Sequence, residues 1–161
     1  MSFANKTIVI TGSASGIGHS ILEAFAKKGA NVAGVDYNGE AIEKIAKELT
    51  KQGYNVCGYK VDVTKKQEIK TAVEDIVKKY GGIDYWVNAA GISHIIPFLE
   101  TSEEIWDNTL NINLKGQFLA CQIAVEHMLK KGKGAIVNIS SQSGKKGTNC
   151  YAPYCASKAG V

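Results

Sequence analysis

Short apolar runs of strand length alternate along this chain with segments whose apolar residues recur at helical spacing. Residues 7–11 form the first run and stop at Gly12, and residues 17–28 then carry one apolar helical face and stop at Gly29. Thr101 and Glu104 have the spacing of a capping box, which predicts the start of a long helix. The pattern predicts strands at residues 7–11, 31–36, 54–61, 83–88 and 135–140, and helices at residues 17–28, 40–52, 65–80 and about 101–131, with another beginning near 151–154.

The predicted strands are apolar almost throughout, unlike strands that have one face in water. Such strands, separated by helices, are typical of a parallel sheet covered on both faces. Right-handed crossovers and a reversal after the third strand give a Rossmann-type, doubly wound α/β fold of strand order 3-2-1-4-5. No linker or repeat interrupts the pattern, so we expect a single dinucleotide-binding domain over residues 1–161.

Composition excludes several classes of protein. The 161 residues carry a net charge of +4, and the lysines are scattered instead of forming the dense basic stripe of a nucleic-acid interface. No apolar run approaches the roughly 18 residues of a membrane span, and no signal peptide is visible. The four cysteines form no CxxC motif and no metal-like pairing with histidine. We therefore expect a cytoplasmic protein with free thiols, no metal, and neither a nucleic-acid nor a membrane partner.

A glycine-rich turn, Thr11–Gly18, joins the first predicted strand to the first predicted helix. Glycines let the backbone approach a pyrophosphate, and the helix N-terminus offers unpaired N–H groups and the positive end of its dipole. An ordinary turn is the alternative, and the position between strand and helix argues against it. The turn is therefore our candidate phosphate site, with cofactor-binding residues Gly12, Ser15, Gly16, Ile17 and Gly18.

Asp36 ends the second predicted strand, 24 residues after Gly12. A carboxylate at this place can accept hydrogen bonds from both hydroxyls of an adenosine ribose, and it repels a 2′-phosphate. Tyr37 follows where an arginine would welcome that phosphate. An aspartate that merely caps the next helix is the alternative. Together with the glycine turn, Asp36 favours NAD(H) over NADP(H).

Tyr154 and Lys158 are four residues apart in the last predicted helix and so share a face. A phenol titrates near pH 10 in water, so a phenol that acts as a base near neutrality needs its anion stabilised, and a lysine ammonium does this. The Tyr-x-x-x-Lys spacing is a weak motif alone. The nearby Tyr151 has Cys155 at its fourth position and cannot form such a pair.

Ser141 follows the fifth predicted strand, at the carboxyl edge where open α/β sheets bind ligands. Its hydroxyl can hold a substrate oxygen beside the Tyr154 phenol. Ser140 is the natural competitor for this role, and a turn serine without a function is the alternative for both.

These residues together resemble the short-chain dehydrogenase/reductase family. The resemblance covers the whole chain, from the T-G-x3-G-I-G turn to Tyr154-Cys155-Ala156-Ser157-Lys158. Each motif is modest, but six of them occur in the family's order. Those between the two ends are Asp62-Val63, Asn88-Ala89-Ala90-Gly91, the stretch Asn111–Gly116 and Asn138-Ile139-Ser140-Ser141.

The resemblance implies a role for each matching residue. Ser141, thirteen residues before Tyr154, matches the serine that orients the substrate, which decides against Ser140. Asn113 matches the asparagine whose backbone holds a water in the proton relay, and a helix kink there would expose the needed carbonyl. Lys158 would also bind the nicotinamide ribose.

Further positions match the family's cofactor site. Asp62 and Val63 match the pair beside the adenine ring, and Asn88 and Gly91 match the segment lining the cofactor ribose. One position departs from the family. Ala89 stands where a second asparagine is common, a residue that knits neighbouring strands together, so the change bears on stability more than on chemistry.

The family implies hydride transfer between NAD(H) and a secondary alcohol or ketone, with Tyr154 moving the proton. The loop from Ser141 to Gly147 is similar to that of bacterial sugar-alcohol and sugar-alcohol-phosphate dehydrogenases. Gln142 and the Lys145-Lys146 pair suit a polyol or polyol phosphate, although paired lysines also merely solubilise loops. His94 is a candidate for the pocket mouth. A 3-oxoacyl or diacetyl/acetoin-type reductase is the alternative.

Two rival readings belong to other classes. A dinucleotide-binding sensor would need no catalytic quartet, yet Asn113, Ser141, Tyr154 and Lys158 are all present. Epimerases and dehydratases of related type usually have a G-x-x-G-x-x-G turn, which is absent here. By analogy with the family we expect a homodimer or homotetramer. Family members usually continue for roughly another hundred residues, so we expect a C-terminally incomplete chain that is inactive in isolation.

Overall fold

A computed structural model describes residues 3–161 of the chain. Its five strands form one parallel sheet of order β3-β2-β1-β4-β5, as the sequence predicts. β1 lies in the middle and pairs with β2 on one side and β4 on the other. The elements are β1 (Thr7–Thr11), α1 (Gly16–Lys27), β2 (Asn31–Asp36), α2 (Gly39–Lys51), β3 (Val56–Lys60), α3 (Lys66–Tyr80), β4 (Tyr85–Asn88), η1 (Phe98–Glu100), α4 (Glu103–Leu110), η2 (Asn111–Lys115), α5 (Gly116–Lys131), β5 (Ala135–Asn138), η3 (Gln142–Gly144) and α6 (Ala152–Gly160).

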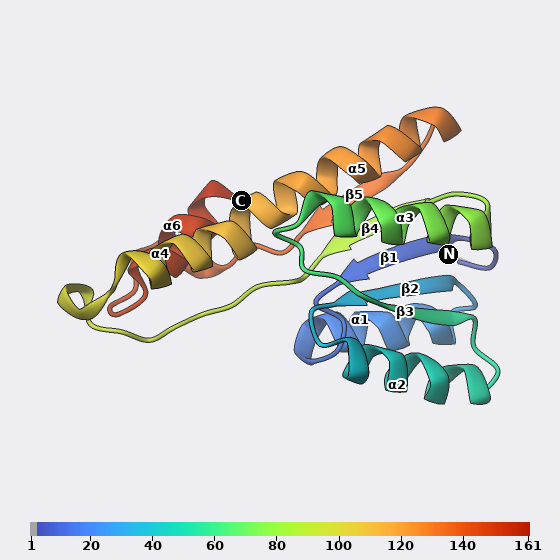
Figure 1. The fold of residues 1–161 in the computed structure, drawn as a ribbon, viewed down its shortest axis with the longest axis horizontal. Coiled ribbons are helices and arrows are strands. Elements are labelled where there is room, and N and C mark those ends of the chain that lie inside the picture. The colour runs from blue at the N-terminus through green and yellow to red at the C-terminus, as the bar shows by residue number, and fades with distance from the viewer. Residues whose placement is uncertain (1–2) are drawn as a thin grey trace.

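Helices cover both faces of the sheet, which confirms the predicted fold class (Figure 1). Successive residues of β1 point to opposite faces. Ile8 and Ile10 pack with α1 and α2, whereas Val9 packs with α3 and α5. Because both faces are buried, every residue of β1 must be shielded from water, and all five are. The unbroken apolar runs of the sequence follow from this two-sided burial.

The capping box predicted at Thr101 and Glu104 is wrong. The N-cap of α4 is Ser102, whose hydroxyl accepts a hydrogen bond from Ile105 N (3.2 Å). Thr101 is already used by the preceding turn, since its hydroxyl donates to Pro97 O (3.2 Å). Two adjacent residues can both cap a helix, and the turn before them decides which one does.

The long helix predicted from about residue 101 to 131 is interrupted by a turn of π-helix, η2. In this turn the N–H of Gly116 donates to the carbonyl of Asn111, five residues earlier. Such π-turns bend helices and are frequent at functional sites. The kink expected at Asn113 is therefore present in the fold.

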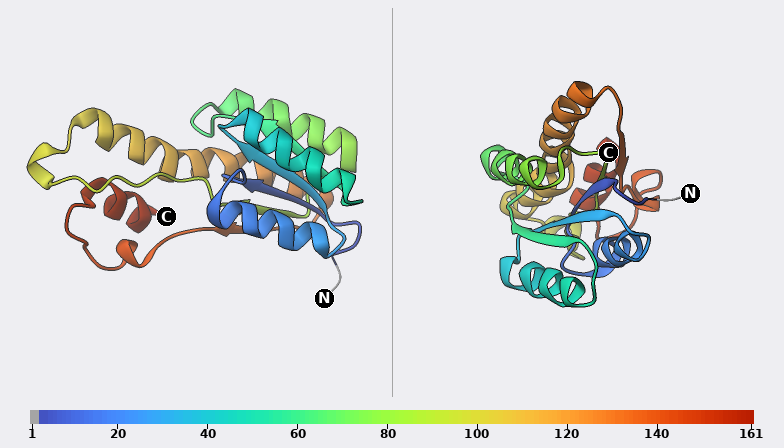
Figure 2. Two further views of the ribbon diagram at one scale, coloured as in Figure 1. Left: turned by 90° about the horizontal axis from the view of Figure 1, so that it is seen from below. Right: turned by 90° about the vertical axis from the view of Figure 1, so that its right-hand side faces the viewer.

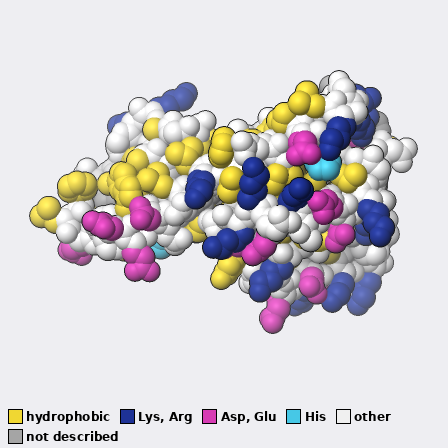
Figure 3. Space-filling model, turned by 45° about the horizontal axis from the view of Figure 1, so that its top comes forward, with side chains coloured by type: hydrophobic (Ala, Val, Ile, Leu, Met, Phe, Trp, Pro, Cys, Tyr) yellow, Lys and Arg dark blue, Asp and Glu magenta, His cyan; other side chains and the backbone are white. Residues whose placement is uncertain are grey.

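Beyond the carboxyl ends of the strands, α4 and α6 lie side by side (Figures 1 and 2). We call α4, η2 and α6, together with the segment from residue 89 to η1, the arm. Exposed apolar side chains gather on this part of the molecule, whereas charged side chains are frequent over the layered sheet and helices (Figure 3). Phe98 and Leu99 are 73% and 95% exposed at the tip.

Candidate cofactor cavity and catalytic residues

A cavity of about 690 Å³ opens at the carboxyl ends of β1, β2, β3 and β4. Ligands of open α/β sheets bind at this edge, where the strand order reverses. Nine predicted cofactor residues line it: Gly12, Ser15, Gly16, Ile17, Gly18, Asp36, Asp62, Val63 and Gly91. The other lining residues are Tyr37, Val61, Thr64, Ala89, Ala90, Ile92, Asn108 and Ile112.

Two glycines of the turn are required by close backbone contacts. Gly12 has φ +67°, and a Cβ atom there would lie 2.6 Å from Ala90 Cα. A Cβ atom on Gly18 would overlap the carbonyl oxygen of Gly12. The turn therefore packs against both the start of its helix and the end of β4, and no side chain fits at either contact.

The N-terminus of α1 is left open toward the cavity. Its N-cap, Ser15, makes no side-chain capping bond, and the first intrahelical bond runs from His19 N to Ser15 O (3.1 Å). The N–H groups of Gly16, Ile17 and Gly18 consequently have no intrahelical partner. Free N–H groups and the positive end of the helix dipole, beside a cavity, form an anion site.

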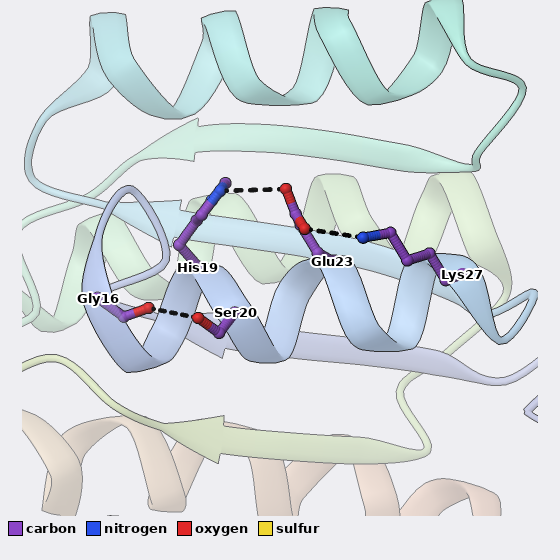
Figure 4. A network of polar contacts seen from close by, with 5 residues as sticks. All are labelled: Gly16, His19, Ser20, Glu23 and Lys27. Carbon is purple, nitrogen blue, oxygen red and sulfur yellow. Dashed lines mark hydrogen bonds and ion pairs between the residues drawn. The ribbon is translucent and has the colours of Figure 1, made fainter.

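The Nε2 atom of His19 is paired along its own helix, as Figure 4 shows, while its buried Nδ1 has no hydrogen-bond partner among the described residues. Its Nε2 lies 3.4 Å from Glu23, which also pairs with Lys27 at 3.0 Å. The hydrogen bond and the charge of Lys27 lower the pKa of the Glu23 carboxyl. One turn before Glu23, the Ser20 hydroxyl donates to Gly16 O (3.1 Å). The candidate anion site at the start of α1 is thus formed by backbone N–H groups.

Asp36 holds the turn in place and also faces the cavity. One carboxylate oxygen accepts from Ala14 N (2.9 Å) and the other from Asn38 N (2.9 Å). A carboxylate has about four acceptor positions, so each oxygen keeps one for a ribose hydroxyl. At the next strand end, Asp62 orders its own turn by accepting from the N–H and the hydroxyl of Thr64 (2.9 and 2.7 Å).

Asn88 is not among the residues that line the cavity. Its side chain is buried and donates to Asn138 Oδ1 (2.8 Å), while its own Oδ1 accepts from Trp86 Nε1 (2.7 Å). The bond to Asn138 joins the ends of β4 and β5, and the bond from Trp86 holds the Asn88 side chain within β4. Asn88 is thus a residue that connects neighbouring strands.

Asn113 is fully buried in the arm and clamps the segment that follows β4. Its Oδ1 accepts from Ile92 N and its Nδ2 donates to Ile92 O, both at 2.8 Å. The same Nδ2 donates to the hydroxyl of Ser157 (3.1 Å). Through this one side chain, η2, the cavity wall at Ile92 and α6 are held together.

Lys158 and Tyr154 are brought together on α6. The Lys158 Nζ lies 5.7 Å from the centroid of the Tyr154 ring and donates to Ile139 O (2.8 Å). The lysine is 6% exposed, and this burial lowers its pKa. A Cβ atom built on Gly91 would lie 3.6 Å from the same Nζ. The ammonium group therefore lies near both the phenol ring and the cavity wall at Gly91.

The two adjacent serines have different surroundings. Ser140 donates to the backbone carbonyl of Lys158 (2.8 Å). Ser141 caps η3 by accepting from Ser143 N (3.2 Å). A hydroxyl that only accepts still has its proton to donate, so Ser141 is the serine left able to bind a substrate oxygen.

The proposed substrate residues lie outside the main cavity. His94 is half-buried in the segment after β4. Gln142 lines a second, shallower hollow of about 440 Å³ on the loop after β5. The other residues around this hollow are Ser143, Lys146, Gly147, Thr148 and Asn149.

Residues 6–161 match the family model for short chain dehydrogenases. The chain belongs to the short-chain dehydrogenase family. This short-chain dehydrogenase is 42% identical to D-threitol dehydrogenase of Mycolicibacterium smegmatis over 97% of the chain and 60% of that protein. It is also 42% identical to a 3-oxoacyl-[acyl-carrier-protein] reductase, FabG, of Thermotoga maritima over 100% of the chain and 65% of that protein.

Two further relatives agree with the family. The NAD-dependent glycerol dehydrogenase of Listeria innocua is 38% identical over 99% of the chain and 62% of that protein. The crystal structure of gox2181 superposes with a TM-score of 0.94 at 32% identity, over 99% of this chain and 63% of that one. This short-chain dehydrogenase thus spans 60–65% of the length of these four relatives. Within residues 3–161, no helix is both long and apolar enough to cross a membrane.

Some lining residues escaped prediction from the sequence. Ala90 and Ile92 flank the predicted Gly91, and a search of its neighbours would have found them. Ile112 likewise directly precedes the predicted Asn113. Asn108 carries no such signal, because it reaches the cavity only through the packing of α4 beyond the sheet.

Proposed function

We propose that this protein is an NAD(H)-dependent oxidoreductase that interconverts a secondary alcohol and a ketone. The observation that carries the proposal is the buried Lys158 ammonium, which lies near both the Tyr154 ring and the wall of the cavity at Gly91. A sensor that only binds a dinucleotide has no need for a buried lysine beside a phenol at this point. Burial of a charged lysine is costly and is characteristic of functional sites.

The residues present fit a dinucleotide. The open N-terminus of α1 would hold the pyrophosphate, and Asp36 would accept hydrogen bonds from the adenosine ribose. Asp62 and Val63 would border the adenine, and Lys158 would reach the second ribose beside Gly91. When bound, the nicotinamide supplies the hydride acceptor or donor, and the protein supplies orientation and charge.

The catalytic side chains divide the proton chemistry between them. Ser141 would hold the substrate oxygen, and Tyr154 would take its proton during oxidation or return it during reduction. Lys158 would bind the nicotinamide ribose and place a positive charge beside the Tyr154 ring. The backbone carbonyl of Asn113, in the π-turn, would hold the water that carries the proton onward.

Asp36 and Tyr37 at the cavity support NAD(H) over NADP(H). A 2′-phosphate would approach the Asp36 carboxylate, and the lining of the cavity includes no arginine or lysine to compensate. The NAD-dependent glycerol dehydrogenase among the relatives agrees with this choice.

A polyol or polyol phosphate is our proposed substrate. Gln142 and Lys146 face a polar hollow directly after the catalytic serine, and two of the relatives are named for D-threitol and glycerol. A 3-oxoacyl reductase is the second candidate, because a FabG protein is as similar as the threitol enzyme. We also propose a homo-oligomer, by analogy with the family.

The test is Tyr154→Phe against Tyr151→Phe. The two rings touch edge to face, 6.0 Å between centroids, so both changes remove one hydroxyl from the same aromatic pair. Tyr154→Phe should lower turnover by roughly 100- to 10,000-fold, the range of general acid–base catalysis, while NADH binding persists. Tyr151→Phe should keep turnover.

Turnover is followed by NADH absorbance with polyols, polyol phosphates, diacetyl and an acetoacetyl thioester, and binding by NADH and NADPH fluorescence. Near-full activity of Tyr154→Phe would show that another group moves the proton. Tighter binding of NADPH than NADH would overturn the assignment of Asp36.

A further inference from the structure

A buried chain of hydrogen bonds joins the cofactor cavity to the helix that carries Tyr154. It starts at Ile92, which lines the cavity and whose N–H and C=O both bind the Asn113 side chain at 2.8 Å. Asn113 Nδ2 continues to the Ser157 hydroxyl (3.1 Å), which donates to the carbonyl of Tyr154 (2.8 Å). Every link except the last joins elements that are far apart in the sequence.

Each side-chain donor and acceptor in this hydrogen-bond chain has a partner. The Asn113 amide has two N–H groups, one spent on Ile92 and one on Ser157. The Ser157 hydroxyl accepts one bond and donates the other. Asn113 and Ser157 are both 0% exposed, so water cannot replace a lost partner. A satisfied polar network in a dry interior fixes the relative position of the elements it joins.

We propose that Ser157 is a positioning residue that sets Tyr154 against the cofactor cavity through Asn113. Tyr154 and Lys158 share α6, so a displacement of that helix moves both away from cofactor and substrate while their own pairing survives. The segment that contains Ile92 is also tied to the residues just before α6, because Ile96 N donates to Cys150 O (2.9 Å), and α4 packs against α6 (Figure 2). The Asn113–Ser157 bond acts within α6 itself, one turn from Tyr154. This inference rests on the proposed function, because it assigns Ser157 to the same site.

The chain offers a matched control at Thr109. Thr109 is also 0% exposed, and its hydroxyl donates to a carbonyl of its own helix, Ile105 O at 2.7 Å, as that of Ser157 does. Only the Ser157 hydroxyl also accepts a bond from another element. Thr109→Val therefore removes a buried helical hydroxyl without breaking the link.

The experiment compares Ser157→Ala, Ser157→Thr and Thr109→Val in the purified full-length protein. Ser157→Ala should lower kcat between about 10- and 100-fold, the cost of misplacing reacting groups by about an ångström. The NADH affinity should fall much less than kcat, because the proposed pyrophosphate and adenosine contacts lie on α1 and at the ends of β2 and β3 and do not depend on α6. Ser157→Thr, which keeps the hydroxyl, should recover most of kcat. Thr109→Val should leave kcat unchanged.

Hydrogen exchange supplies a readout that does not depend on turnover. NADH should slow exchange of the amides of α6 in the unaltered protein and in Thr109→Val, and this protection should be lost in Ser157→Ala at saturating NADH. Equal kcat and equal protection in all variants would overturn the role of Ser157. If Ser157→Thr does not fold, the protection difference between Ser157→Ala and Thr109→Val decides alone.

Failure of the proposed function gives a different pattern. If NADH binds but no substrate is turned over by the unaltered protein, the oxidoreductase assignment fails, and the protection of α6 still reports whether Ser157 links it to the cavity. If Ser157→Ala lowers only the melting temperature, with kcat per folded molecule unchanged, Ser157 is structural and the inference is wrong.

Discussion

The two ends of the candidate site use different parts of the polypeptide, because backbone groups form the cofactor end and buried side chains form the catalytic end. At the cofactor end, the surface offered to a phosphate is backbone: a turn closed by Gly12 and Gly18, and the open first turn of α1. At the catalytic end, buried side chains do the positioning, with Asn113, Ser157 and Lys158 each bonding to another element. The first arrangement has no room for a Cβ atom at Gly12 or Gly18. The second is sensitive to the loss of a hydrogen bond that no neighbouring bond replaces.

This difference explains why the two ends tolerate different substitutions. A backbone site is sensitive to bulk and indifferent to the chemistry of nearby side chains, because its donors are N–H groups that every residue except proline carries. A side-chain site is sensitive to the loss of a single polar atom, because a buried partner is left unpaired. Substitutions that add a methyl group should therefore act at the cofactor end, and those that delete an oxygen should act at the catalytic end.

The largest effect should come from Gly18→Ala. The new Cβ atom would overlap the Gly12 carbonyl oxygen, which belongs to the backbone and has no rotamer to change. Taking about 3 kcal/mol for overpacking of this kind, we expect NADH affinity to fall roughly 100-fold, as the turn shifts away from the pyrophosphate. NADH fluorescence titration measures this.

Gly147→Ala is the control for that substitution. A Cβ atom at Gly147 would meet nothing within 4 Å, and NADH affinity should be unchanged. Wild-type affinity in Gly18→Ala would mean that the turn relaxes freely, and the contrast between a backbone-built and a side-chain-built end would not hold.

Asp84 lies at the opposite edge of the sheet, at the amino ends of the strands. Its substitution should therefore change stability without changing NADH binding. Its side chain accepts from Thr7 N (3.0 Å) and pairs with Lys131 (2.9 Å) and Lys6 (3.6 Å). Burial alone would raise the pKa of Asp84, but the bonds from Lys131 and Thr7 and the charges of both lysines lower it overall. Asp84→Asn should cost about 2 kcal/mol of unfolding free energy at pH 7, the range of hydrogen bonds to a charged group.

The pH dependence of this cost has a defined sign. Because the pKa of Asp84 is lower in the folded than in the unfolded protein, its stabilisation is complete above about pH 4 and is lost as the pH falls through the folded-state value. Urea unfolding of both proteins between pH 7 and pH 3 should show the difference shrinking, with NADH affinity at pH 7 unchanged. A difference that is constant with pH would exclude the carboxylate charge as its cause. Glu126→Gln, which breaks an exposed pair with Lys130, should change stability much less.

How far the sequence predicts each end follows from the same contrast. The turn from Gly12 to Gly18 is one local stretch, so its position between strand and helix could be read directly, and its predicted residues line one cavity. The Tyr154–Lys158 pair is also local, one helical turn apart. The bond between Asn113 and Ser157 spans 44 residues and depends on how α4, η2 and α6 pack, which no local pattern encodes.

Asn88 and Ser102 show two other limits of the sequence. Residues in consecutive positions at the end of β4 face opposite ways, so the motif that contains Asn88 could not say that its side chain turns inward to Asn138 and Trp86. The start of α4 depended on Thr101 being used by the preceding turn, a contact that the capping pattern does not contain.

The smallest effect should come from Ser140→Ala. This substitution removes one of two neighbouring hydrogen bonds that hold Lys158 at the catalytic end. Ser140 donates to the Lys158 carbonyl, but Lys158 is also held nearby through its Nζ on Ile139 O. Loss of one of two neighbouring bonds between β5 and α6 should cost about 1 kcal/mol of stability, the net worth of an ordinary hydrogen bond, and leave kcat within about 3-fold. Ser141→Ala, which removes one oxygen from the adjacent residue, should lower kcat far more because Ser141 retains a proton for the substrate. Thermal unfolding and steady-state turnover of the two variants measure these effects. Equal losses of kcat would show that both serines act by positioning α6. The substrate oxygen would then be held by another group.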